Sequence, residues 1–175
     1  MGLLDKILGK KANDAVRVEI KPFLDEYKGY MTWDLFFDML EKEFNEQYYS
    51  IPQGEYDKIL AEKAKMDKFN ESLFKATDLN NEGVALEKEG KIDEAIAVYE
   101  QNIGKDVYQT HHPYYRLAVL YRKRKDYDNE IRVIEIAIKY LCNGNADIDG
   151  YGQRKAKALE LKRKSLSLNS NENTM

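Results

Sequence analysis

The chain has 175 residues, of which 34% are charged and 43% are hydrophobic, with only three prolines and ten glycines. This composition indicates a globular protein of about one domain and excludes collagen-like and linker-rich architectures. The single cysteine, Cys142, excludes an internal disulfide framework and favours a reducing compartment, so we expect a cytoplasmic protein. The net charge of −3 excludes an overall attraction for nucleic acid or anionic lipid.

Residues 1–21 are predicted to be an amphipathic or flexible N-terminal segment. Its apolar side chains share one helical face beside several lysines (Leu3, Leu4, Ile7 and Leu8; Lys6, Lys10 and Lys11). Asp5 interrupts the apolar run, which excludes a secretory signal, and no stretch of the chain is apolar enough to predict integral membrane association. We expect the segment to fray or to dock on the core, with docking on a partner or on a membrane surface as alternatives. The alternating residues 16–20 fit either a short strand or a weak helix.

Residues 22–76 are predicted to form a helical region. Thr32 is a suitable N-cap for a helix over residues 33–48, which is unusually aromatic, so we expect this helix to be well buried. Residues 50–54 should end it, because they contain a proline and a glycine. A second helix over residues 55–75 would complete a helical hairpin. The large apolar side chains of the first helix are Leu35, Phe36, Phe37, Met39, Leu40, Phe44 and Tyr48.

The pattern of residues 77–142 repeats after 35 residues, and each half has the pattern of helix, turn and helix. Small residues at Gly83, Ala95 and Ala118 would let neighbouring helices approach, while large residues three or four positions away fill the grooves between them. A self-similar period of this length indicates a helical repeat protein. The matched pairs are Leu79 with Tyr114, Gly83 with Ala118, Leu86 with Tyr121, Ala95 with Glu130, Tyr99 with Ile134 and Ile103 with Ile138.

These two units resemble the tetratricopeptide repeat family in the spacing of their large and small residues. The first unit has Gly83, Ala95 and Tyr99 at the family's positions, whereas the second has Glu130 where the family has alanine. The resemblance implies an all-α fold, an α–α superhelix of helical hairpins with the N-terminal helical hairpin at one end. Residues 146–168 are then expected to be a C-terminal capping helix, because each end of a short repeat array exposes an apolar face, and residues 169–175 a disordered tail.

The resemblance also implies a binding surface. In the family, one stripe of each first helix lines a concave groove that binds an extended or helical peptide of a partner protein. An aromatic side chain with two cations in this stripe suits an acidic or amphipathic peptide. The stripe residues are Asn80, Val84 and Glu87 in the first unit and Tyr115, Val119, Arg122 and Lys123 in the second.

The remaining residues predict no catalysis, no metal and no cofactor. Residues 145–150 resemble the start of a calcium loop, but Ala156 stands where that loop needs a bidentate glutamate, so we expect a turn. His111 and His112 are adjacent and point in different directions, which makes a poor metal site. No motif for nucleophilic catalysis surrounds Cys142, and the basic residues 154–164 lack the interleaved aromatics of nucleic-acid binders.

The sequence therefore predicts a non-catalytic protein-interaction module or adaptor. One alternative stays open, in which the repeats serve only as core and the aromatic N-terminal helices form the interaction surface. In that case the chain would be a helical scaffold that forms a homodimer or docks a partner through residues 33–49, because their aromatic side chains exceed what one hairpin is expected to bury.

Overall fold

A computed structural model describes the backbone of residues 15–172 and the side chains of residues 15–167. This part of the chain is mostly helical, with one two-stranded sheet, in agreement with the expected all-α class. It divides into two compact units, unit 1 up to Lys68 and unit 2 from Phe69. The predictions for residues 1–14 and 173–175 lie outside the described residues. Within the described residues, no helix is long and apolar enough to cross a membrane.

Unit 1 combines a short antiparallel sheet with helices. Strand β1 pairs with β2 so that Ala15 lies opposite Pro52 and Glu19 lies opposite Tyr48. The alternating stretch is therefore a strand, and Ile20 begins the next helix. The N-cap prediction is confirmed, because Thr32 Oγ1 accepts a hydrogen bond of 3.4 Å from the backbone N–H of Leu35. The elements are β1 (Ala15–Glu19), α1 (Ile20–Tyr27), a 3₁₀ turn (Lys28–Tyr30), α2 (Trp33–Lys42) and β2 (Tyr48–Pro52).

Two expectations for α2 are wrong. The helix ends at Lys42 rather than near residue 48, because residues 48–52 pair with β1 and this tertiary pairing outweighs the helical pattern. Its aromatic residues are also not well buried, since Leu35 and Met39 face the core while Trp33 is 75% exposed and Phe37 is 58% exposed. The core of unit 1 consists of Ile20, Phe23, Leu24, Leu35, Met39, Ile51 and Ile59.

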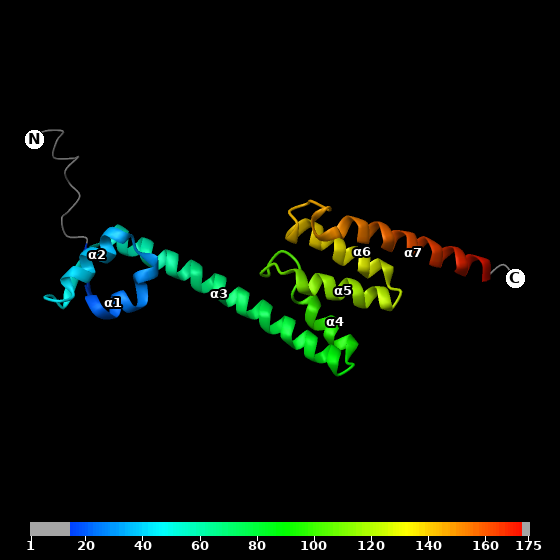
Figure 1. Ribbon diagram of the computed structural model, residues 1–175, viewed down its shortest axis with the longest axis horizontal. Coiled ribbons are helices and arrows are strands. Elements are labelled where there is room, and N and C mark those ends of the chain that lie inside the picture. The colour runs from blue at the N-terminus through cyan, green and yellow to red at the C-terminus, as the bar shows by residue number, and fades with distance from the viewer. Residues whose placement is uncertain (1–14, 173–175) are drawn as a thin grey trace, which may run out of the picture. The chain divides into compact units, whose positions relative to one another are not determined.

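Helix α3 (Gln53–Lys88) is continuous across the two units, and Figure 1 shows it as one uninterrupted helix. The sequence pattern predicted separate helices over residues 55–75 and from residue 77. No proline or glycine lies between residues 55 and 82, so nothing in the backbone ends the helix there. The predicted boundary between residues 76 and 77 thus falls inside α3.

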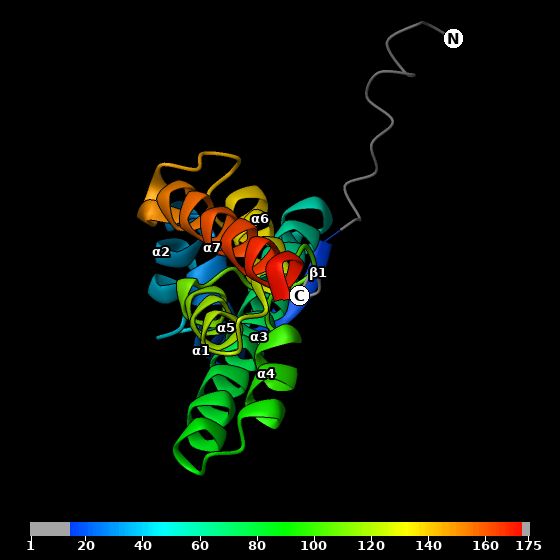
Figure 2. The same ribbon diagram turned by 90° about the vertical axis from the view of Figure 1, so that its right-hand side faces the viewer.

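Unit 2 continues with helices that pack on one another in chain order. Helix α4 packs on α5, α5 on α6 and α6 on α7, as Figures 1 and 2 both show. The predicted turn at residues 145–150 is confirmed, because Asn145 Oδ1 accepts a hydrogen bond of 3.0 Å from the N–H of Asp147 and α7 begins directly afterwards. The elements are α4 (Ile92–Glu100), α5 (His111–Lys123), α6 (Tyr127–Ile136) with a π turn (Ala137–Leu141), a 3₁₀ turn (Ile148–Gly150) and α7 (Tyr151–Glu172).

The 35-residue period of the sequence is present in the backbone of unit 2. Helix α3 ends at Lys88 and α5 ends 35 residues later, at Lys123; α4 and α6 begin at Ile92 and Tyr127, the same interval apart. The residue that turns the chain has a positive φ in both hairpins, +77° at Gly90 and +58° at Lys125. Equivalent hydrogen bonds also close the two turns. In the first hairpin, Lys91 N–H donates to Leu86 O at 2.9 Å and Gly90 N–H donates to Glu87 O at 3.1 Å. In the second, Asp126 N–H donates to Tyr121 O and Lys125 N–H donates to Arg122 O, both at 3.0 Å.

The three small residues of the pattern are buried, as the packing argument requires. Ala95 and Ala118 have no exposed surface, and Gly83 is buried against Tyr99. A Cβ atom at position 83 would lie only 2.3 Å from Cε1 of the Tyr99 ring. The glycine therefore admits an aromatic ring from α4 rather than the backbone of another helix.

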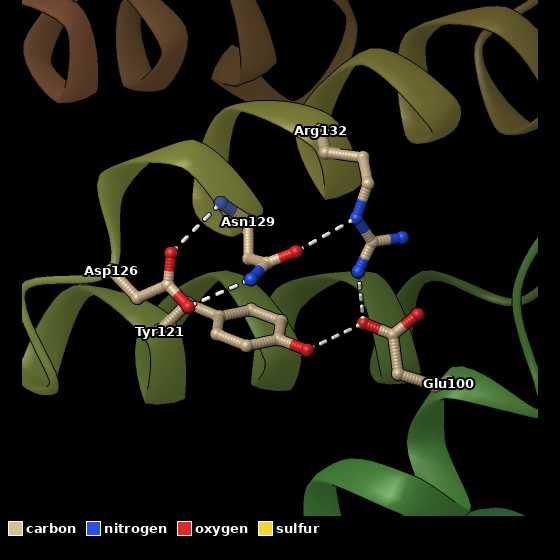
Figure 3. A network of polar contacts seen from close by, with 5 residues as sticks. All are labelled: Glu100, Tyr121, Asp126, Asn129 and Arg132. Carbon is tan, nitrogen blue, oxygen red and sulfur yellow. Dashed lines mark hydrogen bonds and ion pairs between the residues drawn. The ribbon is translucent and has the colours of Figure 1, made fainter.

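A polar network joins α4, α5 and α6 (Figure 3). The carboxylate of Glu100 accepts a hydrogen bond of 2.8 Å from the Tyr121 hydroxyl and pairs with Arg132. Arg132 Nε donates to Asn129 Oδ1 at 3.0 Å, and Asn129 in turn donates to the helix-capping carboxylate of Asp126. Burial and Glu100 raise the pKa of Tyr121 to about 12, so the tyrosine stays a hydrogen-bond donor at neutral pH.

We predict that Gly83→Ala destabilises unit 2 by about 1–3 kcal/mol, because the new methyl group overlaps the Tyr99 ring. Gly54→Ala is the matched control, since it also lies in α3 but has no atom within 4 Å of its Cβ position. It should leave stability unchanged or raise it by up to about 1 kcal/mol. Urea unfolding of the two variants checks this, and equal effects would contradict the packing role of Gly83.

Candidate functional site

The predicted binding stripe lies on α3 and α5 of unit 2, and each half is held by contacts within the chain. Asn80 accepts a hydrogen bond of 3.0 Å from Asn102 Nδ2 and donates one of 3.3 Å to Thr110 Oγ1. Asn102 is itself buried and also donates to the carbonyl of Ala76 at 2.7 Å. Asn80 thus fixes the loop between α4 and α5 against α3, which is a structural use of this residue.

Glu87 is the centre of the first half of the stripe. Its Oε1 accepts a hydrogen bond of 2.8 Å from Arg116 Nε on α5, and its Oε2 pairs with Arg116 Nη2. The Tyr99 hydroxyl donates to the same carboxylate at 2.9 Å. Hydrogen bonds from Arg116 hold the pKa of Glu87 below its usual value, so the pair is ionised at neutral pH and ties α3, α4 and α5 together.

An open pocket of about 310 Å³ lies at this junction, lined by Val84, Glu87, Lys88, His112 and Arg116. His112 Nε2 is buried there without a hydrogen-bond partner in the described part of the chain, and burial lowers the pKa of this histidine. Sequence reasoning missed Arg116, although its spacing of four residues from His112 puts both on one face of α5.

The second half of the stripe surrounds a buried glutamate. Glu130, at the position where the repeat pattern has alanine, has no exposed side-chain surface. Arg122 Nη2 lies 2.6 Å from Glu130 Oε1, and Arg154 Nε of α7 lies 3.8 Å from the same oxygen. Arg122 also donates a hydrogen bond of 3.3 Å to the carbonyl of Arg154. Arg122 on α5 therefore contacts both α6 and α7, and its charge is already paired with Glu130.

Tyr115, Val119 and Lys123 complete the stripe with different degrees of exposure. Tyr115 is 42% exposed, and Arg154 covers one part of it, with its guanidinium 4.9 Å from the ring centroid. Val119 is half-buried, whereas Lys123 is exposed and makes no ion pair with any residue between 15 and 167. The structure thus brings all seven predicted residues onto α3 and α5, and it leaves Lys123 as the least engaged of their charges.

The two histidines and the cysteine of unit 2 pack against other parts of the fold. Among the described residues, no three histidine, cysteine or acidic side chains are grouped in a way that could hold a metal ion. His111 stacks on Tyr115 with ring centroids 5.8 Å apart, while His112 lies against Tyr99. Burial raises the pKa of the Cys142 thiol, which keeps it protonated and weakly nucleophilic.

We predict that Glu130→Ala destabilises the protein by about 3–5 kcal/mol, although alanine is the residue of the repeat pattern. The substitution leaves Arg122 and Arg154 without their shared carboxylate. Glu135→Ala is the matched control on α6, because both side chains of the Glu135–Lys155 pair reach solvent and the pair should contribute less than about 1 kcal/mol. Denaturant unfolding compares them, and a neutral Glu130→Ala would show that the buried charge is dispensable.

A pH-dependent effect is expected for Arg116→Gln. The lowered pKa of Glu87 means that the ion pair stabilises the fold above the usual carboxyl value of 4.5, and that this contribution is lost as the pH falls through the lower folded-state value. The variant should therefore be less stable than the parent near neutral pH, with a gap that closes in acid. Urea midpoints at several pH values measure the gap, and a constant gap would exclude the ion pair as its cause.

Comparison with known proteins assigns no family to this chain. No family model, no curated protein and no solved structure matches it.

Proposed function

We propose that unit 2 is a short array of tetratricopeptide-like hairpins and that the chain acts as a non-catalytic adaptor in the cytoplasm. The observation that carries the proposal is the 35-residue repetition of helix ends, positive-φ turns and turn hydrogen bonds between the α3–α4 and α5–α6 hairpins. Stacked hairpins of this kind present their first helices side by side as one surface. In this proposal, α7 covers the end of the array in the role of a capping helix.

The binding surface is the stripe on α3 and α5, together with the pocket beside Glu87. The two carboxylates near it, Glu87 and Glu130, are already paired with arginines. Lys123 of the stripe and Lys88 on the pocket wall are exposed and make no ion pair within the described residues, so the accessible charge of this surface is positive. Together with the half-exposed ring of Tyr115, this surface suits an acidic or amphipathic segment of a partner protein.

The test is selection from a library of random peptides displayed on phage, with the full-length protein as bait. We expect enriched peptides to combine Asp or Glu with apolar residues, and Lys88→Glu with Lys123→Glu to weaken their binding at least about tenfold. Lys75→Glu with Lys105→Glu is the matched control, since it makes the same charge change at exposed positions away from the stripe. If no peptide is enriched, or if both double variants lose binding equally, the stripe is not the binding surface.

A second candidate function is favoured by the exposure of aromatic residues in unit 1. Trp33 is 75% exposed and Phe37 is 58% exposed on the face of α2 that points away from the core. Exposed aromatic groups of this size mark interaction surfaces in proteins. Under this proposal, the chain docks a second copy of itself or another protein through α2, and unit 2 contributes packing only.

A further inference from the structure

Three aromatic side chains of α2 form one cluster. Trp33 stacks on Phe37 with ring centroids 5.8 Å apart, and Phe36 meets both rings edge-on at 6.0 and 5.3 Å. We call Trp33, Phe36 and Phe37 the α2 aromatic cluster. Trp33 and Phe37 are exposed and take no part in the core of unit 1, whereas the half-buried Phe36 packs against that core beside Leu35 and Met39.

The segment that carries this cluster is negatively charged. Residues 33–47 contain five carboxylates and a single lysine, Lys42, which gives a local charge of −4. Lys42 pairs with Asp38 at 3.4 Å, and among the described residues no cation pairs with the other four carboxylates. The five acidic residues are Asp34, Asp38, Glu41, Glu43 and Glu46.

The segment after α2 lines a pocket of about 840 Å³. Phe44, which is 86% exposed, lies on its wall and supplies apolar surface. Lys21 is the only basic residue on the wall, against four acidic ones, so the pocket has the same sign of charge as the helix. The acidic residues of the wall are Glu19, Asp25, Glu43 and Glu46.

We propose that the α2 aromatic cluster and the acidic pocket formed by the segment after α2 bind a basic amphipathic segment of a partner protein. The aromatic rings would take the apolar face of that segment, and the carboxylates would take its lysine or arginine side chains. The inference rests on the second candidate function and selects between its two occupants. A second copy packed symmetrically on this face would bring two surfaces of charge −4 together, which opposes that arrangement.

The only tryptophan of the chain lies in the cluster, so its fluorescence reports directly on occupancy. The probe is a synthetic helical peptide of about 18 residues, or five helical turns, made of leucine on one face and lysine on the other. We expect it to shift Trp33 emission to shorter wavelength, to protect the ring from acrylamide quenching, and to bind more weakly as salt is raised. A peptide with glutamate in place of every lysine should not bind.

Variants of the full-length chain locate the site. Phe37→Ser, and separately Glu41→Lys with Glu43→Lys, should each weaken binding of the lysine peptide at least about tenfold without loss of helicity by circular dichroism. Phe74→Ser is the matched control, because Phe74 is also an exposed aromatic residue, at 65%, and lies in unit 2. Equal weakening by Phe74→Ser, or equal binding of both peptides, would overturn the proposal.

Self-association separates failure of this inference from failure of the second candidate function. If light scattering shows a dimer, and Phe37→Ser dissociates it and restores solvent-exposed Trp33 emission, then a second copy is the occupant; the inference fails while the candidate function stands. If the chain is monomeric and neither peptide changes Trp33 emission, both are rejected. A monomer that binds only the lysine peptide supports both this inference and the second candidate function.

Discussion

The contact of Tyr99 with Gly83 is the interaction on which the packing of unit 2 depends. The ring occupies the space that any side chain at position 83 would fill, and its hydroxyl donates to Glu87 one helical turn further along α3. Glu87 then holds Arg116 of α5. Tyr99 therefore contacts both Gly83 and the Glu87–Arg116 ion pair. A larger side chain at position 83 would disturb that ion pair as well as the packing.

Charge has a structural use in the second hairpin, where the repeat pattern leaves room only for a small residue. Glu130 is fully buried, and Arg122 and Arg154 approach it from two other helices. A buried carboxylate with two guanidinium partners costs desolvation energy, but losing one partner would cost more. The arrangement makes the position of α7 depend on the hairpin beside it, and it removes Arg122 from the set of cations that a ligand could use.

The surface proposed for unit 2 and the surface proposed for unit 1 are opposite in charge. In unit 2, Glu87 and Glu130 form ion pairs with arginines of the same chain, so Lys88 and Lys123 determine the accessible charge. In unit 1, Lys42 is paired with Asp38, so the uncompensated charge around the α2 aromatic cluster is negative. Each proposed surface would therefore select a partner segment of the opposite charge, and the two proposals share no side chain.

The sequence by itself determined the helical class, the 35-residue period, the small residues that must be buried and the N-cap at Thr32. These properties depend on residues close in the chain or at a fixed interval, so spacing alone predicts them. Sequence reasoning predicted that the stripe residues lie in helices, as they do, but it could not show that Arg116 pairs with Glu87. These two residues are 29 positions apart, and the pair depends on how α5 lies against α3.

Only the tertiary structure decided the rest. Whether residues 48–52 end a helix or form a strand depended on the pairing with β1, and whether α2 buries its aromatic or its aliphatic side depended on which side the rest of unit 1 covers. Whether Glu130 could be buried was decided in the same way, because a buried charge is tolerated only where partners from other helices reach it. Local pattern fixes what each segment prefers, while burial and charge pairing between distant segments select among those preferences.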